Sequence, residues 1–266
     1  MGTKSVIEFW YKKLNFPSKY DEEFYRALEE IVIPADSKLE DYDPRCEDGK
    51  RNLLAYLYFC EELKRRYEEK GIGEDVLLDT LSDLVVWTDV WSDLKGELWL
   101  GELYWLNFHL GMRLFKLGRL QFCLGKAKHD APAHGLAKGD TVVEMHIQAV
   151  GPLKREDCLA SVARAREFFA KYYPEQPYKC FTCHSWLMDK KLDEVLSPDS
   201  NIIRFRNMYD IVHEQPSDAI LKYVFKWDTT AENLAQTPAT SNFAQRVKER
   251  RLAGERFNES LGIWRD

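Results

Sequence analysis

Apolar side chains recur every three or four positions along the first hundred residues, which is the period of an α-helix. Three segments show this pattern and are predicted to form helices, at residues 21–33, 52–71 and 73–96. Pro34 is expected to end the first helix, and Gly71 lies where the C-cap of the second belongs. The apolar stripe along the third segment is more typical of a helix face that packs in a core than of a cofactor site.

A fourth segment, residues 97–118, is apolar on nearly every side and predicts one long helix buried between two layers. It carries His109, which is more typical of a core residue with satisfied hydrogen bonds than of a metal ligand. Gly96 interrupts the helical pattern, so we place a domain boundary there, with a helical domain at 1–95 and a second domain at 96–266. We expect the helical domain to pack on the second one, because the apolar helix needs cover on both sides.

From residue 119 the period changes to two, which predicts β-strands at 119–124 and 140–148 joined by a polar loop. The second strand separates its side chains by chemistry, because alternate residues of a strand point to opposite faces. One face carries a carboxylate, an imidazole and an amide and the other is apolar, with Glu144, His146 and Gln148 on the first face and Val143, Met145 and Ile147 on the second.

A helical pattern at 153–173 follows, and a short aromatic and β-branched segment at 178–187 then predicts another strand. The order strand, helix, strand indicates a mixed sheet with a crossover helix. The remaining patterns predict a short helix, two strands and a last helix, at residues 186–196, 201–211, 219–227 and 240–254.

Cys180, Cys183 and His184 form a C-x-x-C-H sequence, which raises the question of a metal or redox site. Residues three apart on a strand point to opposite faces, so the two thiols cannot bind one ion without a turn between them. A redox pair would instead need its first thiol at a helix N-terminus. The pattern therefore favours buried strand cysteines and no metal, while His184 and Ser185 lie where the strand leaves the sheet.

Composition restricts the classes of partner. The 266 residues carry a net charge of −6 and contain no long basic run, which argues against nucleic acid. An apolar stretch long enough to span a membrane is also lacking, and the six cysteines are scattered as in a reducing compartment. We therefore expect a cytoplasmic protein that binds a small molecule, and the sequence does not predict its oligomeric state.

Five segments of the chain carry a resemblance to a known family: LFKLGRLQF, MHIQAVGPLKREDCLASVARAREFF, CHSWLMDKKL, SNIIRF and TSNFAQRVKERRLAG. In these segments and in its order of elements the chain resembles the mostly bacterial acyltransferase-like proteins that join a helical N-acyltransferase N-terminal domain to a GNAT-like C-terminal domain. The resemblance implies an α+β fold, a mixed sheet with helices on both sides, and coenzyme A or acyl-CoA as co-substrate.

In that superfamily, the loop after the fourth strand offers backbone N–H groups to the pyrophosphate of coenzyme A at a helix N-terminus. The resemblance places this loop at Val150, Gly151, Leu153, Lys154 and Arg155. The usual Q/R-x-x-G-x-G/A signature is absent, and the proline at position 152 removes one donor. Two acidic residues follow in the first helical turn, where they would repel an anion, at positions 156 and 157.

Acyl transfer to an amine needs a base for the attacking ammonium and an acid for the leaving thiolate. Glu144 and His146 are the candidates for the base, and His184 or Ser185 is the candidate for the thiolate side. The two strands that carry them would splay to admit the pantetheine arm. The alternative is that Glu144 and His146 form a structural hydrogen-bonded pair on a covered sheet face.

Two functions therefore remain open at the level of sequence. The first is an acyl-CoA-dependent N-acyltransferase that acts on a small amine or amino-group acceptor. The second is a catalytically inactive GNAT-like domain that binds a small molecule or a protein partner. The histidines at 129 and 134 lie in the polar loop, where we expect them to be solvated unless that loop covers a substrate.

Overall fold

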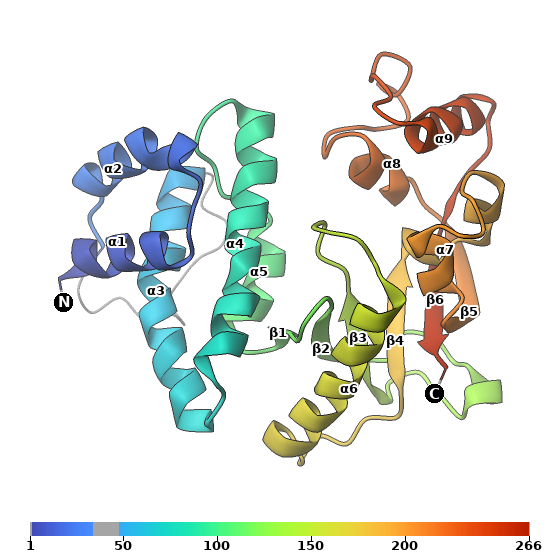
Figure 1. Ribbon diagram of the computed structural model, residues 1–266, viewed down its shortest axis with the longest axis horizontal. Helices are drawn as coiled ribbons and strands as arrows, with labels where there is room; N and C mark the ends of the chain where they lie inside the picture. Colours follow the sequence, from blue (N-terminus) through green and yellow to red (C-terminus); the bar gives the residue numbers. More distant parts are fainter. Residues whose placement is uncertain (1, 34–47, 266) are drawn as a thin grey trace. The chain divides into compact units, whose positions relative to one another are not determined.

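A computed structural model describes residues 2–33 and 48–265 of the chain (Figure 1). The chain forms two compact units, Met1–Leu117 and Gly118–Asp266. The division therefore lies after residue 117, further along the chain than the boundary expected at residue 96. Pro34 and Cys46 lie outside the described residues.

The first unit is helical. The helices among its described residues are α1 (Thr3–Lys13), η1 (Ser18–Tyr20), α2 (Asp21–Glu30), α3 (Gly49–Lys70), α4 (Glu74–Lys95) and α5 (Leu103–Leu110), of which η1 is a 3-10 turn. Asp48 caps α3 by accepting hydrogen bonds from the backbone N–H groups of Lys50 and Arg51. Gly71 and Gly96 end α3 and α4 in the left-handed conformation that favours glycine, with φ of 74° and 76°. The long amphipathic helices thus lie where the apolar period predicts them.

The prediction of one helix over 97–118 is wrong. Only α5 is helical there, and the chain then becomes extended in β1 (Leu114–Lys116). Glu102 and Met112 on either side of α5 have φ of 54° and 50°, which breaks a right-handed helix at both ends. An apolar segment without a period does not specify its conformation, and here the backbone turns twice within it.

His109 of α5 is a core residue, as predicted, but only one of its two ring nitrogens has a hydrogen-bond partner. Its side chain is fully buried, and its Nε2 lies 2.9 Å from Oδ2 of the buried Asp83 on α4. The same carboxylate oxygen accepts a hydrogen bond from Nε1 of Trp105. Asp83 therefore joins α4 to α5 inside the helical unit.

The second unit contains five strands of the mixed sheet, β2 to β6, and the fold class is α+β as expected. The strand order of the six-stranded sheet is β1-β2-β3-β4-β6-β5. The pair β3–β4 is parallel, and the pairs β2–β3, β4–β6 and β5–β6 are antiparallel. The strands after β1 are β2 (Gln121–Lys126), β3 (Thr141–His146), β4 (Phe181–Ser185), β5 (Tyr209–Pro216) and β6 (Asn258–Trp264).

Helix α6 (Arg155–Tyr172) connects the two parallel strands, as the strand–helix–strand pattern predicts (Figure 1). Arg166 of α6 lies over the ring of Phe181 on β4, and this ring meets Phe122 of β2 edge to face. On the same apolar face, the hydroxyl of Tyr209 lies 3.6 Å from the sulfur of Met145. The opposite face of the sheet carries the polar side chains of β3 and β4.

Two predicted strands are wrong, and two strands of the sheet, β1 and β6, have no counterpart among the predictions. Residues 201–211 begin with helix α7 (Asn201–Arg206) before β5, because Ser200 caps the helix by accepting a hydrogen bond from the N–H of Ile203. Residues 219–227 begin with helix α8 (Ala219–Val224), whose Ile220 and Leu221 enter a small apolar cluster. Of these two unpredicted strands, β1 lies at the edge of the sheet and β6 lies between β4 and β5.

The remaining elements of the second unit are short turns and a helix. They are η3 (Pro132–His134), η4 (Trp186–Met188), η5 (Lys190–Glu194) and α9 (Asn242–Leu252). Helix α9 lies within the predicted range 240–254 and begins after Ser241, whose hydroxyl oxygen accepts a hydrogen bond from the N–H of Ala244. The predicted short helix after β4 is the pair of 3-10 turns η4 and η5.

Cys183 is buried in β4, and Cys180 precedes the strand in a partly exposed position. The five cysteines in the described ranges are thiols that form no disulfide with one another. Burial raises the pKa of the Cys183 thiol far above its usual value, which keeps it protonated.

Residues 2–33 and 48–265 contain no group of three or more His, Cys, Asp or Glu side chains placed to hold a metal ion. No helix in these ranges is long and apolar enough to cross a membrane.

Candidate functional site

The sheet divides between its two parallel strands. The register pairs only Val143 with Phe181 and Glu144 with Thr182 in the described part of β3 and β4. Further along, His146 lies opposite Gln121 of β2, and His184 lies opposite Leu261 of β6. Each strand thus keeps its outer neighbour while the two part from each other, which is the splay expected for them.

Glu144 and His146 lie side by side on the polar face of β3. His146 Nε2 is 3.7 Å from Glu144 Oε2, and each side chain is a little over one quarter exposed. The carboxylate lies over Gly125 of β2, where an added Cβ would come within 2.6 Å of Oε1. Gly125 therefore provides the space that the Glu144 side chain occupies.

The surroundings of Glu144 favour its ionised form. Burial alone would raise the pKa of this carboxyl, but the interactions with His146, Lys128 and His184 outweigh burial and lower it. Glu144 is therefore a carboxylate at neutral pH. It can accept a proton or hold an adjacent imidazolium, and it cannot act as an acid there.

His184 is half-buried at the carboxyl end of β4, on the same face as Glu144. Its Nε2 is buried and has no hydrogen-bond partner in the structure. Burial is the main cause that lowers the pKa of this imidazole, and Lys128, His129 and His213 act in the same direction against the opposing charge of Glu259. His184 is therefore neutral at pH 7, with a ring nitrogen available to a ligand.

Ser185 takes a different position from the other three candidates. It follows His184 on the strand, so its side chain points to the opposite face of the sheet. Its hydroxyl oxygen accepts a hydrogen bond from the N–H of Leu187 at 3.2 Å and so caps η4. The structure brings Glu144, His146 and His184 to one face and gives Ser185 a structural hydrogen bond.

The loop between β2 and β3 covers part of the polar face. Its Ala131 and Leu136 pack in a small apolar cluster with Val142 and Ile263 of the sheet. The ring of His129 stacks on that of His213 on β5, with centroids 3.7 Å apart and planes 18° apart. The loop is therefore attached to the sheet, and His129 is partly buried instead of solvated, whereas His134 is exposed.

The predicted phosphate loop runs from the end of β3 to the start of α6. Val150 and Gly151 are exposed, and Gly151 has a φ of 68° that favours glycine. Lys154 and Arg155 are exposed at the helix N-terminus, whereas the Leu153 side chain is buried and leaves only its backbone for a ligand. The structure provides no side-chain cap for α6, so its first-turn N–H groups have no such partner.

Sequence reasoning missed Arg119, which lies in the turn before β2. Its guanidinium donates hydrogen bonds to three backbone carbonyl oxygens of the phosphate loop, those of Gln148, Gly151 and Pro152, at 3.3, 3.0 and 3.0 Å. No local pattern marks an arginine whose partners lie 29 to 33 positions further along the chain. His213 was missed for the same reason, because it reaches the site only through strand pairing.

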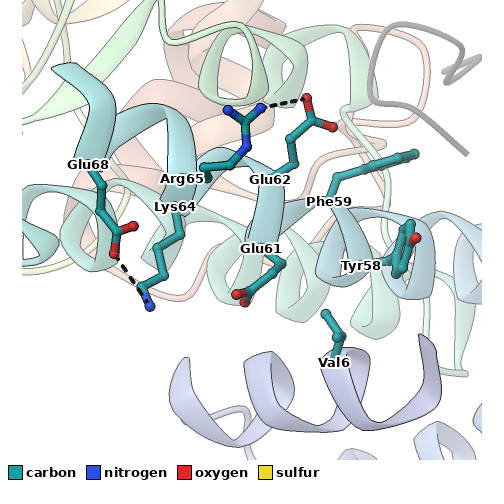
Figure 2. A pocket seen from close by; sticks show the side chains of 8 residues that line it. All are labelled: Val6, Tyr58, Phe59, Glu61, Glu62, Lys64, Arg65 and Glu68. Carbon is teal, nitrogen blue, oxygen red and sulfur yellow. Dashed lines mark ion pairs between the residues drawn. The ribbon is translucent and has the colours of Figure 1, made fainter. Parts of the chain in front are cut away.

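A separate groove lies in the first unit. It has a volume of about 470 Å³ and lies between Val6 of α1 and the face of α3 from Tyr58 to Glu68 (Figure 2). Its charged side chains already pair with neighbours, as Lys64 with Glu68 and Glu61 with Nε1 of Trp10. The groove therefore lacks the convergent titratable groups of the sheet site.

A mixed sheet whose parallel strands part before a glycine-containing loop and a helix N-terminus defines a GNAT-like fold. The family models match over nearly the whole chain: an N-acyltransferase N-terminal domain at residues 3–112 and a GNAT-like C-terminal domain at residues 114–264. The chain belongs to the family of proteins with this GNAT-like C-terminal domain, preceded by the N-acyltransferase N-terminal domain. No curated protein matches the chain.

Solved structures of acyltransferases have the same fold. An acyltransferase in complex with decanoyl-CoA and teicoplanin is 23% identical with a TM-score of 0.79, and the match covers 96% of this chain and 85% of that one. An acyltransferase in complex with decanoyl-CoA is 28% identical with a TM-score of 0.69, over 80% of this chain and 64% of that one. A third, in complex with CoA and 10C-teicoplanin, is 23% identical with a TM-score of 0.80, over 96% and 86% of the two chains.

Proposed function

We propose that the protein is an acyl-CoA-dependent N-acyltransferase that acts on an amino-group acceptor. The observation that carries this proposal is the parting of β3 and β4 beyond Glu144 and Thr182, with Glu144, His146 and His184 on one face at the opening. Such an opening in the middle of a sheet gives an extended pantetheine arm a place to lie. The solved acyltransferases with this fold contain CoA or decanoyl-CoA, which supports the same donor class here.

The chemistry joins an amine nitrogen to the thioester carbonyl carbon and breaks the carbon–sulfur bond. Glu144 and His146 would remove the proton from the attacking ammonium, since the carboxylate can stabilise the imidazolium that forms. The neutral His184, with its proton on Nε2, would donate a hydrogen bond to the developing oxyanion or to the departing sulfur, and the CoA thiolate then takes up the proton that His146 removed from the ammonium. Ser185 is left out of these steps, because its side chain lies on the other face of β4.

The phosphate end of the donor would lie at the loop of Val150, Gly151 and Leu153, with Lys154 and Arg155 at its edge. Backbone N–H groups at a helix N-terminus suit a pyrophosphate, and two exposed cations add to the attraction. The two acidic residues in the first turn of α6 act against it. The two cations offset these two carboxylates in charge, so the residues of the loop fit the donor.

The acceptor is the less defined substrate. Amines that could attack a thioester in such a site range from small amines to larger amino compounds, and two solved acyltransferases of this fold contain teicoplanin or its 10C form. We therefore propose an acceptor with a primary amino group, and we include bulky amino-group compounds in its test.

The test has two stages. Acyl-CoA donors of several chain lengths are first added to the protein, and a ligand at 100 times its dissociation constant should raise the unfolding free energy by about 2.7 kcal/mol. Amines, amino acids and glycopeptides are then screened for release of the CoA thiol and formation of the amide. Loss of turnover in His146→Ala and His184→Ala, with binding of the donor retained, is the expected result.

An exposed histidine in the same unit provides the control, and His134→Ala should keep full turnover. Donor binding without any turnover across the screen would favour an inactive domain that binds acyl-CoA. Absence of donor binding would refute the proposed function.

A further inference from the structure

Arg119 makes an unusual set of contacts with the phosphate loop. All three of its hydrogen bonds from the side chain go to backbone carbonyl oxygens, from Nε to Pro152, from Nη2 to Gly151 and from Nη1 to Gln148. These carbonyls span the loop between β3 and α6. One guanidinium thus fixes the loop at both ends.

The backbone of Arg119 is itself attached to α6. Its N–H donates a hydrogen bond of 2.7 Å to the hydroxyl of Ser161, and the N–H of Leu120 donates a second one to the same oxygen. Gly118 comes so close to Ser161 that an added Cβ would lie 2.8 Å from the hydroxyl oxygen. The turn that carries Arg119, the loop and the helix therefore form one connected structure.

The direction of the carbonyls determines the direction of the N–H groups. In a trans peptide the C=O and N–H point to opposite sides, so carbonyls of Gln148 and Pro152 that face Arg119 turn the N–H groups of Ala149 and Leu153 away from it. Within the described residues, neither of these N–H groups donates to a backbone carbonyl. The peptide after Gly151 has no N–H, and Arg119 binds its carbonyl as well.

Charge gives a second, independent argument. The side-chain partners of Arg119 are carbonyl oxygens, and Asp157 of α6 attracts its charge without forming an ion pair with it in the part of the chain that the structure describes. Carbonyl oxygens accept hydrogen bonds from a guanidinium but do not neutralise it, so the positive charge of Arg119 remains next to the loop. A cation of this kind beside the first turn of a helix favours an anion at that place.

We propose, on the basis of the proposed function, that Arg119 is the positioning residue of the phosphate loop: it turns the loop N–H groups toward the pyrophosphate of the acyl donor. The glycine-rich signature that shapes this loop in the superfamily is absent here. Arg119, which lies in a turn outside the loop, shapes the loop instead. Arg119 acts through the loop backbone and does not touch the reacting thioester, so it is not a catalytic residue.

The test compares two donors that share a thioester but differ in the phosphates. Acyl-CoA carries the pyrophosphate, and the matching acyl N-acetylcysteamine thioester does not. In Arg119→Ala, affinity for CoA measured by calorimetry should fall by about tenfold or more, because the charge-assisted hydrogen bonds that order the loop are removed. The KM for acyl-CoA should rise with it, while kcat/KM for the N-acetylcysteamine thioester stays unchanged.

Conservative variants of Arg119 show whether its hydrogen-bonding geometry or its charge determines the affinity for CoA. Arg119→Lys keeps the charge but lacks the planar fork, so it should restore only part of the affinity for CoA. Arg204→Ala, at an exposed arginine of α7 that pairs with Asp199, is the matched control and should bind CoA as the unmodified protein does. Should Arg119→Ala be too unstable to purify, Arg119→Gln retains two amide donors and provides the same comparison.

Three results would overturn the role of Arg119: an equal decrease with both donors, no decrease with either, or full restoration of affinity by Arg119→Lys. An equal decrease would indicate a general structural role. A failure of the unmodified protein to bind CoA is a different outcome, because it refutes the proposed function before any variant is compared.

Discussion

Gly125→Ala moves the Glu144 carboxylate without removing it. An alanine Cβ at this position would come within 2.6 Å of Oε1 and 2.7 Å of the carboxyl carbon. These atoms are at the end of a flexible side chain, so we expect the carboxylate to swing away while the backbone stays. Alanine in place of glycine also lowers the entropy of the unfolded chain, which stabilises the protein by about 0.4–1 kcal/mol where the backbone allows it.

The effect on the candidate base follows from the distance to His146. At 3.7 Å the attraction between carboxylate and imidazolium is about 4 kcal/mol at an effective dielectric near 20. A displacement to roughly twice that distance halves it, so the imidazolium loses about 2 kcal/mol of stabilisation. If this stabilisation acts in the transition state, turnover falls about thirtyfold.

The assay is release of the CoA thiol with an acceptor from the screen, together with a melting curve for each variant. Gly2→Ala is the control, since an added Cβ there meets no atom within 4 Å. A Gly125→Ala variant with unchanged turnover, and with a displaced carboxylate in its crystal structure, would refute the role of Glu144. The structural hydrogen-bonded pair would then be the better interpretation of Glu144 and His146.

Three further predictions concern other groups. Replacement of Lys154 and Arg155 by alanine should weaken CoA binding by about 1.5–3 kcal/mol for each charge-assisted hydrogen bond removed, as measured by calorimetry. Asp83→Ala leaves the buried Nε2 of His109 and Nε1 of Trp105 without their shared partner and should lower the unfolding free energy by about 1–3 kcal/mol for each group, as measured with denaturant. His184 has a pKa below its usual 6.5 in the folded protein, so the unfolded chain binds more protons there and stability should fall as the pH drops below 6.5. His184→Gln should reduce that slope in denaturant titrations across this pH range.

The helices α2, α3 and α4 of the first unit could be predicted because each buries one stripe, and a stripe leaves a period in the sequence. The short helix α1 has no counterpart among the predictions. The segment around α5 has no polar side to reveal where its backbone turns, and the left-handed residues Glu102 and Met112 are of types that rarely mark such turns. The segments of α7 and α8 are only six residues each, too short for either period to dominate. Their conformation is decided by the Ser200 cap and by packing in the apolar cluster of the second unit.

The candidate site likewise contains some residues that the sequence predicts and others that it does not. The side chains of Glu144 and His146 share a face because they are two apart on one strand, which the alternation predicts. That His184 lies near them could be predicted from the strand–helix–strand order alone. Arg119 and Gly125 come from other strands and turns, and only the register and the path of the loop bring them to the site.

His109 and His184 show how burial alone fails to separate a structural histidine from a functional one. Each has one ring nitrogen that is buried and without a hydrogen-bond partner, Nδ1 in His109 and Nε2 in His184. An unsatisfied buried polar atom costs about 1–3 kcal/mol, so both need an explanation. His109 offsets that cost through Asp83 within a closed helical core. His184 lies where two strands part, and burial and its basic neighbours keep it neutral, so a bound substrate is the partner that would satisfy its nitrogen.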